Sequence, residues 1–200
     1  MPKQRITKEM VVDAAFEIAR NGGMEQVMVK NIAGKIGCSV QPIYSYCKNM
    51  EGLRRDVAER TRCFIKEYIE THIDPSDLFR STGRAYIRLA EEEPKLFQIF
   101  VLGQRENIAS LDDLYRAESD PQIAEAIAGQ LGIEADQARR LHMSMLIYTI
   151  GIGTILAVTT PGIPPDEIWK QQETAYEAFV KQILEERTGD SDGKKDNHHL

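Results

Sequence analysis

Apolar residues recur at helical spacing along almost the whole chain. No stretch alternates apolar and polar residues for more than a few positions, as a half-buried β-strand does. In the first segment the apolar residues occupy positions i, i+4, i+7 and i+8, which form one face of a helix: Val11, Ala15, Ile18 and Ala19. The pattern therefore predicts an all-α protein.

Three short helices are predicted near the N-terminus, over residues 7–21, 29–36 and 40–46. Gly37 ends the second helix, because glycine readily adopts the left-handed conformation that closes a helix. Ser39 is placed to cap the third helix with its hydroxyl. A short helix, a glycine turn and another short helix follow in the order of a helix-turn-helix motif, whose second helix enters the major groove of DNA.

The rest of the chain predicts a larger helical body. Prolines interrupt the helical pattern and separate one helix from the next. Helices are expected at residues 50–71, from the break at 74–76 to about residue 92, and from residue 94 onward. Further helices are expected at 121–131, 134–158 and 165–187, with partial helix in 103–120. The pattern divides the chain into a helix-turn-helix head (1–49), a helical body (50–187) and a polar tail (188–200) that we expect to be disordered.

The net charge of -6 is distributed unevenly between the head and the body. Residues 1–50 contain seven Lys and Arg against four Asp and Glu, so they carry +3 and the remaining 150 residues carry -9. A basic head on an acidic body favours a polyanionic partner for the head alone. An imbalance of this size also arises by chance, so charge by itself does not identify the partner.

The cysteines and histidines predict neither a metal site nor a cofactor. Cys38, Cys47 and Cys63 form no C-x-x-C pair, and no His and Cys residues cluster at zinc spacing. His72 and His142 are isolated in the sequence. Cys38 and Cys47 flank the third predicted helix, which allows a thiol redox switch or, alternatively, two small buried apolar side chains.

Membrane insertion and enzymatic activity are not expected. The longest apolar run, from Met145 to Val158, is shorter than the ~20 residues that span a bilayer, and the first ten residues lack the apolar segment of a signal peptide. The chain contains no Gly-rich phosphate loop, no G-x-S-x-G and no H-E-x-x-H. We therefore expect a soluble cytoplasmic protein that is not an enzyme.

Small, apolar and aromatic residues at particular spacings carry a family resemblance. They are Ala14-Ala15, Gly22, Ile32-Ala33, Gly37-Cys38-Ser39, Ile43-Tyr44-Ser45-Tyr46 and Glu51-x-Leu53. On these positions, residues 7–57 resemble the DNA-binding head of the TetR family of transcriptional regulators. The chain departs from the family pattern at Met28, where a polar cap is usual, at Cys47, where an aromatic residue is usual, and at Met50, where a lysine is usual.

The third predicted helix supplies most of the candidate DNA-binding residues. Gln41 suits a bidentate contact with adenine, and Val40 or Pro42 suits a thymine methyl group. Tyr44 and Tyr46 can reach phosphate oxygens, although either ring could instead pack on the first helix. Ile43 and Cys47 belong to the buried face of this helix. The predicted DNA-binding set is Lys30, Ser39, Val40, Gln41, Pro42, Tyr44, Ser45, Tyr46 and Lys48.

The resemblance implies a ligand-responsive regulator, expected to be a repressor that binds a palindromic operator as a homodimer. It also implies that the last two long helices form a four-helix interface with their mates. Gly151 and Gly153 would let another helix approach closely, whereas the alternative makes helix 134–158 the central core helix of one subunit. The alternative function is a helical dimerisation or small-molecule-binding protein that binds no operator.

The family places several helices around a cavity, so aromatic residues on those helices are candidates for effector binding. We expect a small, largely apolar effector, because ligand pockets are lined by apolar side chains with a few polar groups. For each residue the alternative is an ordinary place in the core. The predicted effector set is Tyr86, Phe97, Phe100, Gln104, Tyr115, His142, Met143 and Tyr148, with Thr149 as a further polar contact.

Overall fold

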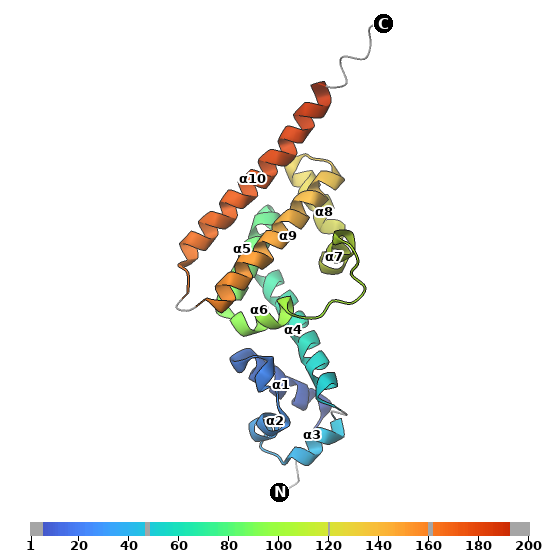
Figure 1. Cartoon of the computed structure of the whole chain (residues 1–200), viewed down its shortest axis with the longest axis vertical. Coiled ribbons are helices and arrows are strands. Elements are labelled where there is room, and N and C mark those ends of the chain that lie inside the picture. Colours follow the sequence, from blue (N-terminus) through green and yellow to red (C-terminus); the bar gives the residue numbers. More distant parts are fainter. Residues whose placement is uncertain (1–5, 47–48, 120, 160–161, 193–200) are drawn as a thin grey trace. The chain divides into compact units, whose positions relative to one another are not determined.

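The computed structural model describes residues 6–46, 49–119, 121–159 and 162–192. Throughout these ranges the regular structure is helical, which confirms the predicted all-α class (Figure 1). The α-helices are α1 (Lys8–Gly22), α2 (Val29–Ile36), α3 (Val40–Tyr46), α4 (Met50–His72), α5 (Leu78–Glu92), α6 (Pro94–Val101), α7 (Leu111–Glu118), α8 (Pro121–Leu131), α9 (Ala135–Val158) and α10 (Pro165–Asp192). Single 3-10 turns occupy Met24–Gln26 and Pro75–Asp77.

The last helix is longer than the sequence pattern predicts. The prediction ends this helix at residue 187, whereas α10 continues to Asp192. No proline after Thr188 stops the helix. Each residue added to an existing helix gains one backbone hydrogen bond, so the helix can continue beyond its apolar pattern. The rest of the predicted tail, 193–200, lies outside the described residues, and the boundary between head and body at residues 49 and 50 stays a prediction.

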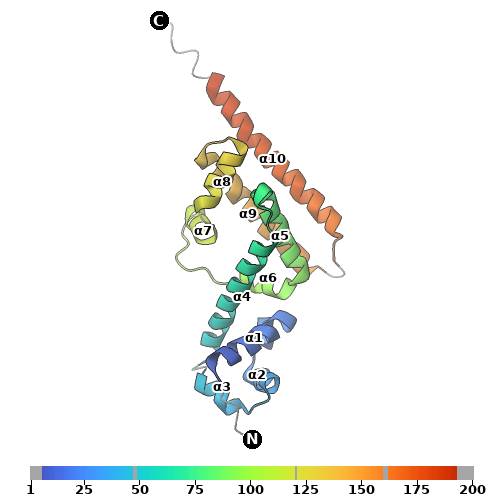
Figure 2. The same cartoon turned by 180° about the vertical axis from the view of Figure 1, so that it is seen from behind.

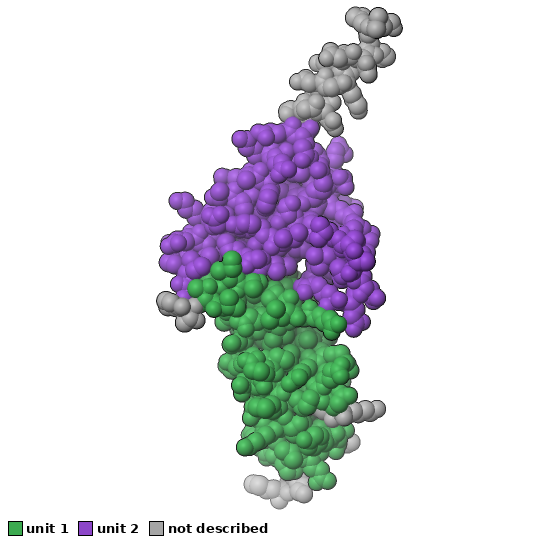
Figure 3. All heavy atoms as spheres, in the orientation of Figure 1, with its two compact units in different colours: residues 1–73, 85–104, 153–159 green, residues 74–84, 105–152, 160–200 purple. Residues whose placement is uncertain are grey.

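The chain forms two compact units (Figure 3). The first unit contains residues 1–73, 85–104 and 153–159, and the second contains residues 74–84, 105–152 and 160–200. The predicted head is therefore part of a unit that also includes α4, α6 and the C-terminal end of α9. Helices α5 and α9 each contribute residues to both units.

The first unit has an apolar core built from α1 to α4. Val11 and Ala15 of α1, Ile32 of α2, Ile43 of α3, and Leu53 and Val57 of α4 are all almost completely buried in it. Burial of a large aliphatic side chain contributes about 1.5–3 kcal/mol. Because Ile43 is the buried anchor of α3, the neighbouring positions of that short helix are turned outward.

The turn between α2 and α3 depends on one glycine. Gly37 adopts the left-handed conformation, with φ at 77°, and its amide donates to the carbonyl of Ala33. The amide of Cys38 donates to the same carbonyl, so the end of α2 is closed by two hydrogen bonds. A side chain at residue 37 would be strained in this conformation. The predicted glycine turn is therefore present, and it sets the direction in which α3 leaves α2.

An ion pair within the first unit links α1 to the start of α6. The guanidinium of Arg20 donates from Nε to both carboxylate oxygens of Glu93, at 3.0 and 2.9 Å. The carboxylate of Glu93 raises the pKa of Arg20. The same guanidinium lies 5.2 Å from the ring centroid of Phe64 in α4. Three helices thus meet at one arginine, in the last turn of α1.

The second unit is organised by α10, which runs antiparallel to α9 (Figures 1 and 2). Gln172 of α10 donates to Thr149 Oγ1 at 3.4 Å, and Tyr148 donates to the carbonyl of Gln171 at 3.3 Å. Between these helices lies an apolar core shared with α5 and α8. Its buried members are Phe79, Ile127, Ala138, Leu141, Met145, Tyr176 and Ile183.

By length and composition alone, α9 could cross a membrane. It has 24 residues, and an 18-residue window reaches a mean hydropathy of 1.8, with 33% of that window buried inside the protein. The expectation that the apolar run is too short is therefore incomplete, because the helix extends well before Met145. The N-terminal half of α9 packs in the core of the second unit, as a core helix of a soluble protein also does.

The two glycines of α9 differ in their surroundings. A Cβ atom on Gly151 would meet open space, whereas a Cβ atom on Gly153 would lie 2.6 Å from Cζ of the buried Phe97. Gly153 therefore admits the close approach of another helix, as predicted, but that helix is α6 of the same chain.

We expect Gly153→Ala to lower the free energy of unfolding by about 1–3 kcal/mol, because the Phe97 ring is fully buried and must shift. The matched control is Gly129→Ala in α8, where the added Cβ meets open space. That variant should gain about 0.5–1 kcal/mol from the higher helix propensity of alanine. Urea unfolding measures the free energy of unfolding of both variants. If the two variants are equally stable, the Phe97 ring moves aside without an energetic cost.

Candidate functional site

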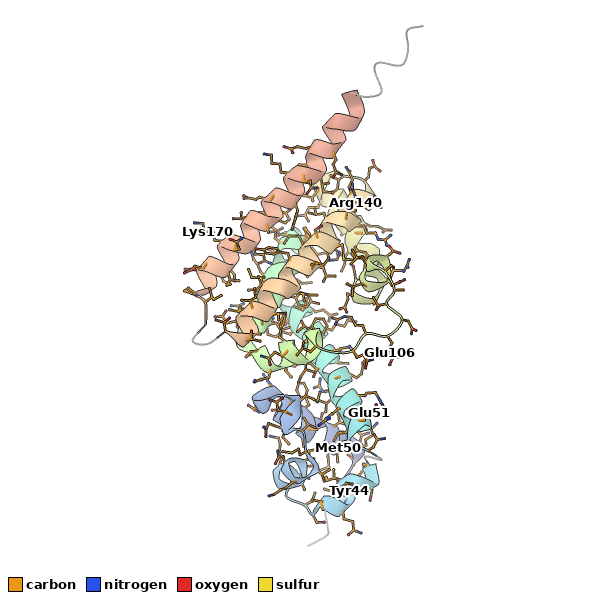
Figure 4. All side chains as sticks on the ribbon, viewed as in Figure 1. Tyr44, Met50, Glu51, Glu106, Arg140 and Lys170 are labelled. Atoms are coloured by element: carbon orange, nitrogen blue, oxygen red, sulfur yellow. The ribbon has the colours of Figure 1, made fainter. Side chains whose placement is uncertain are left out.

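The side chains of α3 form the exposed surface of the head. Val40 is 44% exposed, Tyr44 63% and Tyr46 38%, while Ile43 between them is fully buried. Figure 4 shows Tyr44 on the outer side of α3. A large part of each of these apolar and aromatic side chains is not covered by the chain. That part is available to a partner.

The exposure of the two tyrosines bears differently on the alternative interpretation, which packs one ring on α1 with its hydroxyl at the surface. Tyr44 is 63% exposed, so most of its side chain is not covered by the chain. Tyr46 is 38% exposed, which fits either interpretation. The hydroxyls of both residues can thus approach a phosphate without any rearrangement of the core.

The other predicted DNA-binding residues lie on or beside the same surface. Ser39 is exposed directly before α3, Gln41 and Ser45 are exposed, and Pro42 is half-buried. The Ser45 hydroxyl donates to the carbonyl of Gln41 at 3.3 Å, one helical turn back. Lys30 is exposed on α2. Lys48 lies outside the described residues, as does Cys47.

Several basic side chains of the first unit are already occupied by acids. Lys8 pairs with Asp56 at 2.9 Å, and Arg55 pairs with Glu51 at 2.8 Å. Lys30 and Lys35 are both exposed on α2, and neither forms an ion pair with any residue in the described ranges. The charges of these two lysines are therefore not neutralised by any acidic residue that the structure describes.

Cys38 and Cys63 are free thiols in different surroundings. Cys38 is half-buried and packs against the core of the first unit, as a small apolar side chain does. Cys63 is exposed on α4. Because Cys47 is not described, the structure does not test the redox interpretation of the pair that flanks α3.

The predicted effector residues divide equally between the two units. In the first unit Phe97 is fully buried, the rings of Tyr86 and Phe100 stack with centroids 6.2 Å apart, and Gln104 is exposed. In the second unit Tyr115 and His142 are buried, while Met143 and Tyr148 are half-buried. The structure therefore describes two groups of four residues, and the assignment of the whole set to one cavity stays a prediction.

Tyr115 and His142 form a buried polar contact. The Tyr115 hydroxyl lies 2.9 Å from Nδ1 of His142, and the Ser119 hydroxyl lies 3.3 Å from the same nitrogen. The ring of Phe79 meets the imidazole edge-on, at 5.8 Å between centroids. Burial lowers the pKa of His142 to about 4, so the imidazole is neutral at physiological pH.

A surface pocket of about 400 Å³ opens beside this contact, between α7, α8 and α9. That volume is within the range of small-molecule sites. Arg139 lies over the Tyr115 ring, at 5.3 Å from its centroid, and also pairs with Asp112. The pocket is lined by Tyr115, Arg116, Ser119, Ala124, Glu125, Ala135, Asp136 and Arg139.

Sequence reasoning missed Ser119 and Arg139 as neighbours of the contact between Tyr115 and His142. Ser119 lies near the end of the polar stretch 103–120, whose period is irregular, and Arg139 lies in the charged first turns of α9. Neither position carries a local signal, because the approach of Ser119 to His142 and of Arg139 to Tyr115 depends on how α7 packs against α9. An aromatic residue and a histidine 27 positions apart offer no spacing rule by which to pair them.

Comparison with known proteins identifies the fold. No protein-family model matches the sequence, and no curated protein matches it. A transcriptional regulator from Rhodococcus sp. Rha1 has a solved structure that is similar, with a TM-score of 0.62, 16% identity and coverage of 90% of this chain and 97% of that one. The solved structure of a TetR-like regulator from the same source is also similar, with a TM-score of 0.58, 14% identity and coverage of 84% of this chain and 92% of that one. The chain has the fold of the TetR-family transcriptional regulators.

A single-residue variant of TetR from Acinetobacter baumannii, solved in complex with minocycline, is also similar. Its TM-score is 0.60 at 14% identity, with coverage of 91% of this chain and 98% of that one. Coverage this complete means that the TetR fold extends over the body as well as the head. At this identity the likeness concerns the fold, so the roles of individual residues rest on the geometry described above.

Proposed function

We propose that the chain is a transcriptional regulator that binds double-stranded DNA through α3. The observation that carries the proposal is the outward presentation of Val40, Gln41 and Tyr44 on a helix anchored by one buried isoleucine. A recognition helix of a helix-turn-helix reads base edges with its N-terminal residues. The TetR fold supports the same assignment, and a protein with this function acts in the cytoplasm, where the DNA is.

The regulator binds a palindromic operator as a homodimer that forms through α9 and α10. The supporting observation is an apolar stripe on the outer face of α9, made by Ile147, Gly151, Ile155 and Val158, all of which are exposed. These positions are three or four residues apart, so they share one face of the helix. A twofold dimer reads two half-sites about one helical turn of DNA apart, ~34–36 Å or somewhat more.

The protein acts as a repressor, and a small, largely apolar effector that binds in the body releases it from the operator. The support is chemical: the candidate residues combine buried aromatic rings with a few hydrogen-bonding groups, as ligand sites do. The similar TetR from Acinetobacter baumannii was solved with a small molecule, minocycline. An effector changes DNA binding only if its affinity differs between two arrangements of the heads.

The alternative function is a helical protein that dimerises or binds a small molecule and has no operator. The neutral, amphipathic side chains on α3 are the feature that argues against it, because exposed rings without a partner are unfavourable in water. Binding to genomic DNA fragments over a range of salt concentrations separates the two functions. Specific DNA binding weakens as salt rises, in proportion to the number of phosphate contacts.

We expect Gln41→Ala and Tyr44→Ala each to weaken operator binding, because both side chains are exposed on the surface of α3 that is proposed to contact DNA. For Gln41→Ala the loss should be about 5- to 150-fold, which corresponds to the ~1–3 kcal/mol of a bidentate base contact. The operator is first selected from genomic fragments, and affinities are then measured by mobility shift. The matched control is Gln130→Ala, an exposed glutamine on α8. Wild-type affinity in both α3 variants would mean that another element reads the DNA.

A further inference from the structure

The residue types of α3 restrict the base pairs that it can read. The helix consists of seven residues, VQPIYSY, and none of them carries a charge. Guanine is read chiefly by Arg or Lys, which donate to O6 and N7, and cytosine by Asp or Glu, which accept from the N4 amino group. The described recognition helix therefore lacks the usual readers of both partners in a G·C pair.

Two of its outward side chains instead match an A·T pair. Gln41 is exposed, and its side-chain amide makes no hydrogen bond to any residue in the described ranges, so both of its groups remain free. An amide of this kind donates to N7 and accepts from N6 of adenine. Val40 is 44% exposed in the first position of the helix and offers an apolar surface to a thymine methyl group.

The position of these residues within the helix matters as much as their chemistry. Val40 and Gln41 are at the N-terminal end of α3, the part of a recognition helix that meets base edges. The unpaired lysines nearest in sequence, Lys30 and Lys35, are on α2, and the first helix of the motif crosses the phosphate backbone. Lys48 follows α3 in the sequence and lies outside the described residues.

We propose that the operator presents A·T base pairs to α3 and that thymine 5-methyl groups are part of what the protein recognises. This inference rests on the proposed DNA-binding function and specifies the class of sequence that it reads. Gln41 selects adenine in the major groove. Val40 or Pro42 discriminates thymine from any pyrimidine that lacks the methyl group.

The test begins with selection of binding sites by the full-length protein from random duplex DNA. The purines that the protein contacts in the major groove are then located by replacing each adenine and guanine, one position at a time, with its 7-deaza analogue, which removes the N7 acceptor. Next, each thymine of the selected site is replaced by deoxyuridine, one position at a time, which removes only the methyl group. We expect the sensitive purines to be adenines of A·T pairs, and a loss of affinity of about fourfold for each contacted methyl group.

The variants Val40→Ala and Pro42→Ala assign the contact. At least one of them should bring the ratio of thymine to uracil affinity close to one, while the exposed-site control Gln130→Ala leaves the ratio unchanged. Contacted purines that are guanines, or no effect of any uracil substitution, would overturn the inference and leave the regulatory function standing. A methyl effect that persists in both variants would overturn the assignment to α3. Failure to enrich any sequence would overturn the DNA-binding function itself.

Discussion

The double variant Ile147→Asp/Ile155→Asp is expected to be a monomer at micromolar concentrations at which the wild-type protein is a dimer. The two isoleucines are 49% and 54% exposed, and eight positions apart on α9 they share one face with Gly151. Because a twofold interface is self-complementary, each substitution occurs twice in the dimer. Because about half of each isoleucine is still exposed in the subunit, loss of four of them removes about 3–6 kcal/mol of association free energy, and four unpaired carboxylates add to the loss.

The folded subunit should tolerate this change. Both side chains lie at the surface of the chain, where substitutions usually alter the free energy of unfolding by less than about 0.5 kcal/mol. The matched control is Leu111→Asp, an exposed leucine in the first turn of α7 and outside the α9 stripe. Sedimentation velocity measures the mass of each variant, and far-ultraviolet circular dichroism confirms that the helices persist.

The dimer result also bears on DNA binding. A monomer presents one copy of α3 and can occupy only one half-site, so affinity for a palindromic operator should fall together with dimerisation. A wild-type protein that sediments as a monomer would reject the dimer proposal. A double variant that remains dimeric would show instead that the interface lies on another face.

Acid should destabilise the folded protein in the range between about pH 6.5 and pH 4, and His142 should be responsible for much of the loss. Burial lowers the pKa of His142 from 6.5 to about 4. Between these values the unfolded chain binds a proton that the folded chain excludes, so stability is complete above the upper value and falls as the pH decreases. A shift of this size corresponds to about 3 kcal/mol.

The surroundings of His142 explain why it remains neutral. Among the described residues, its recorded partners are the hydroxyls of Tyr115 and Ser119 and the rings of Tyr115 and Phe79, and none of them is a carboxylate that would stabilise an imidazolium. Protonation would therefore place a positive charge in a buried site without compensation.

Urea unfolding at pH 7 and at pH 5 measures this effect. The wild-type protein should lose stability between the two values, and His142→Gln should show a flatter dependence, since glutamine keeps a hydrogen-bonding group but does not titrate. The control His72→Gln alters an exposed histidine and should follow the wild type. Hydrogen bonds from Ser110 and Arg116 lower the pKa of Asp113 to about 2, so its own contribution is lost only at more acidic pH. An unchanged pH dependence in His142→Gln would contradict the assignment.

The head of this protein was predictable because its signals are local. The left-handed glycine at residue 37 and the helical spacing of apolar residues act over a few positions, so α1 to α3 begin and end within about one residue of the predicted limits. The buried face of α3 followed from the same spacing, with Ile43 completely buried. Of the predicted reading residues in the described ranges, all but the half-buried Pro42 are exposed, while their contact with DNA stays a prediction.

Only the tertiary structure decided features that depend on residues far apart in the sequence. Arg20 and Glu93 pair across 73 positions, and the contact between Tyr115 and His142 exists because α7 packs on α9. The sequence presents Gly151 and Gly153 as equivalent small residues in one apolar helix. Which of them lies open and which is filled by the ring of Phe97 depends on the placement of α6 against that helix. Spacing along the chain determines which face of a helix a residue occupies. The neighbours of that face are determined by packing between segments that are far apart in the sequence, and local patterns carry no information about that packing.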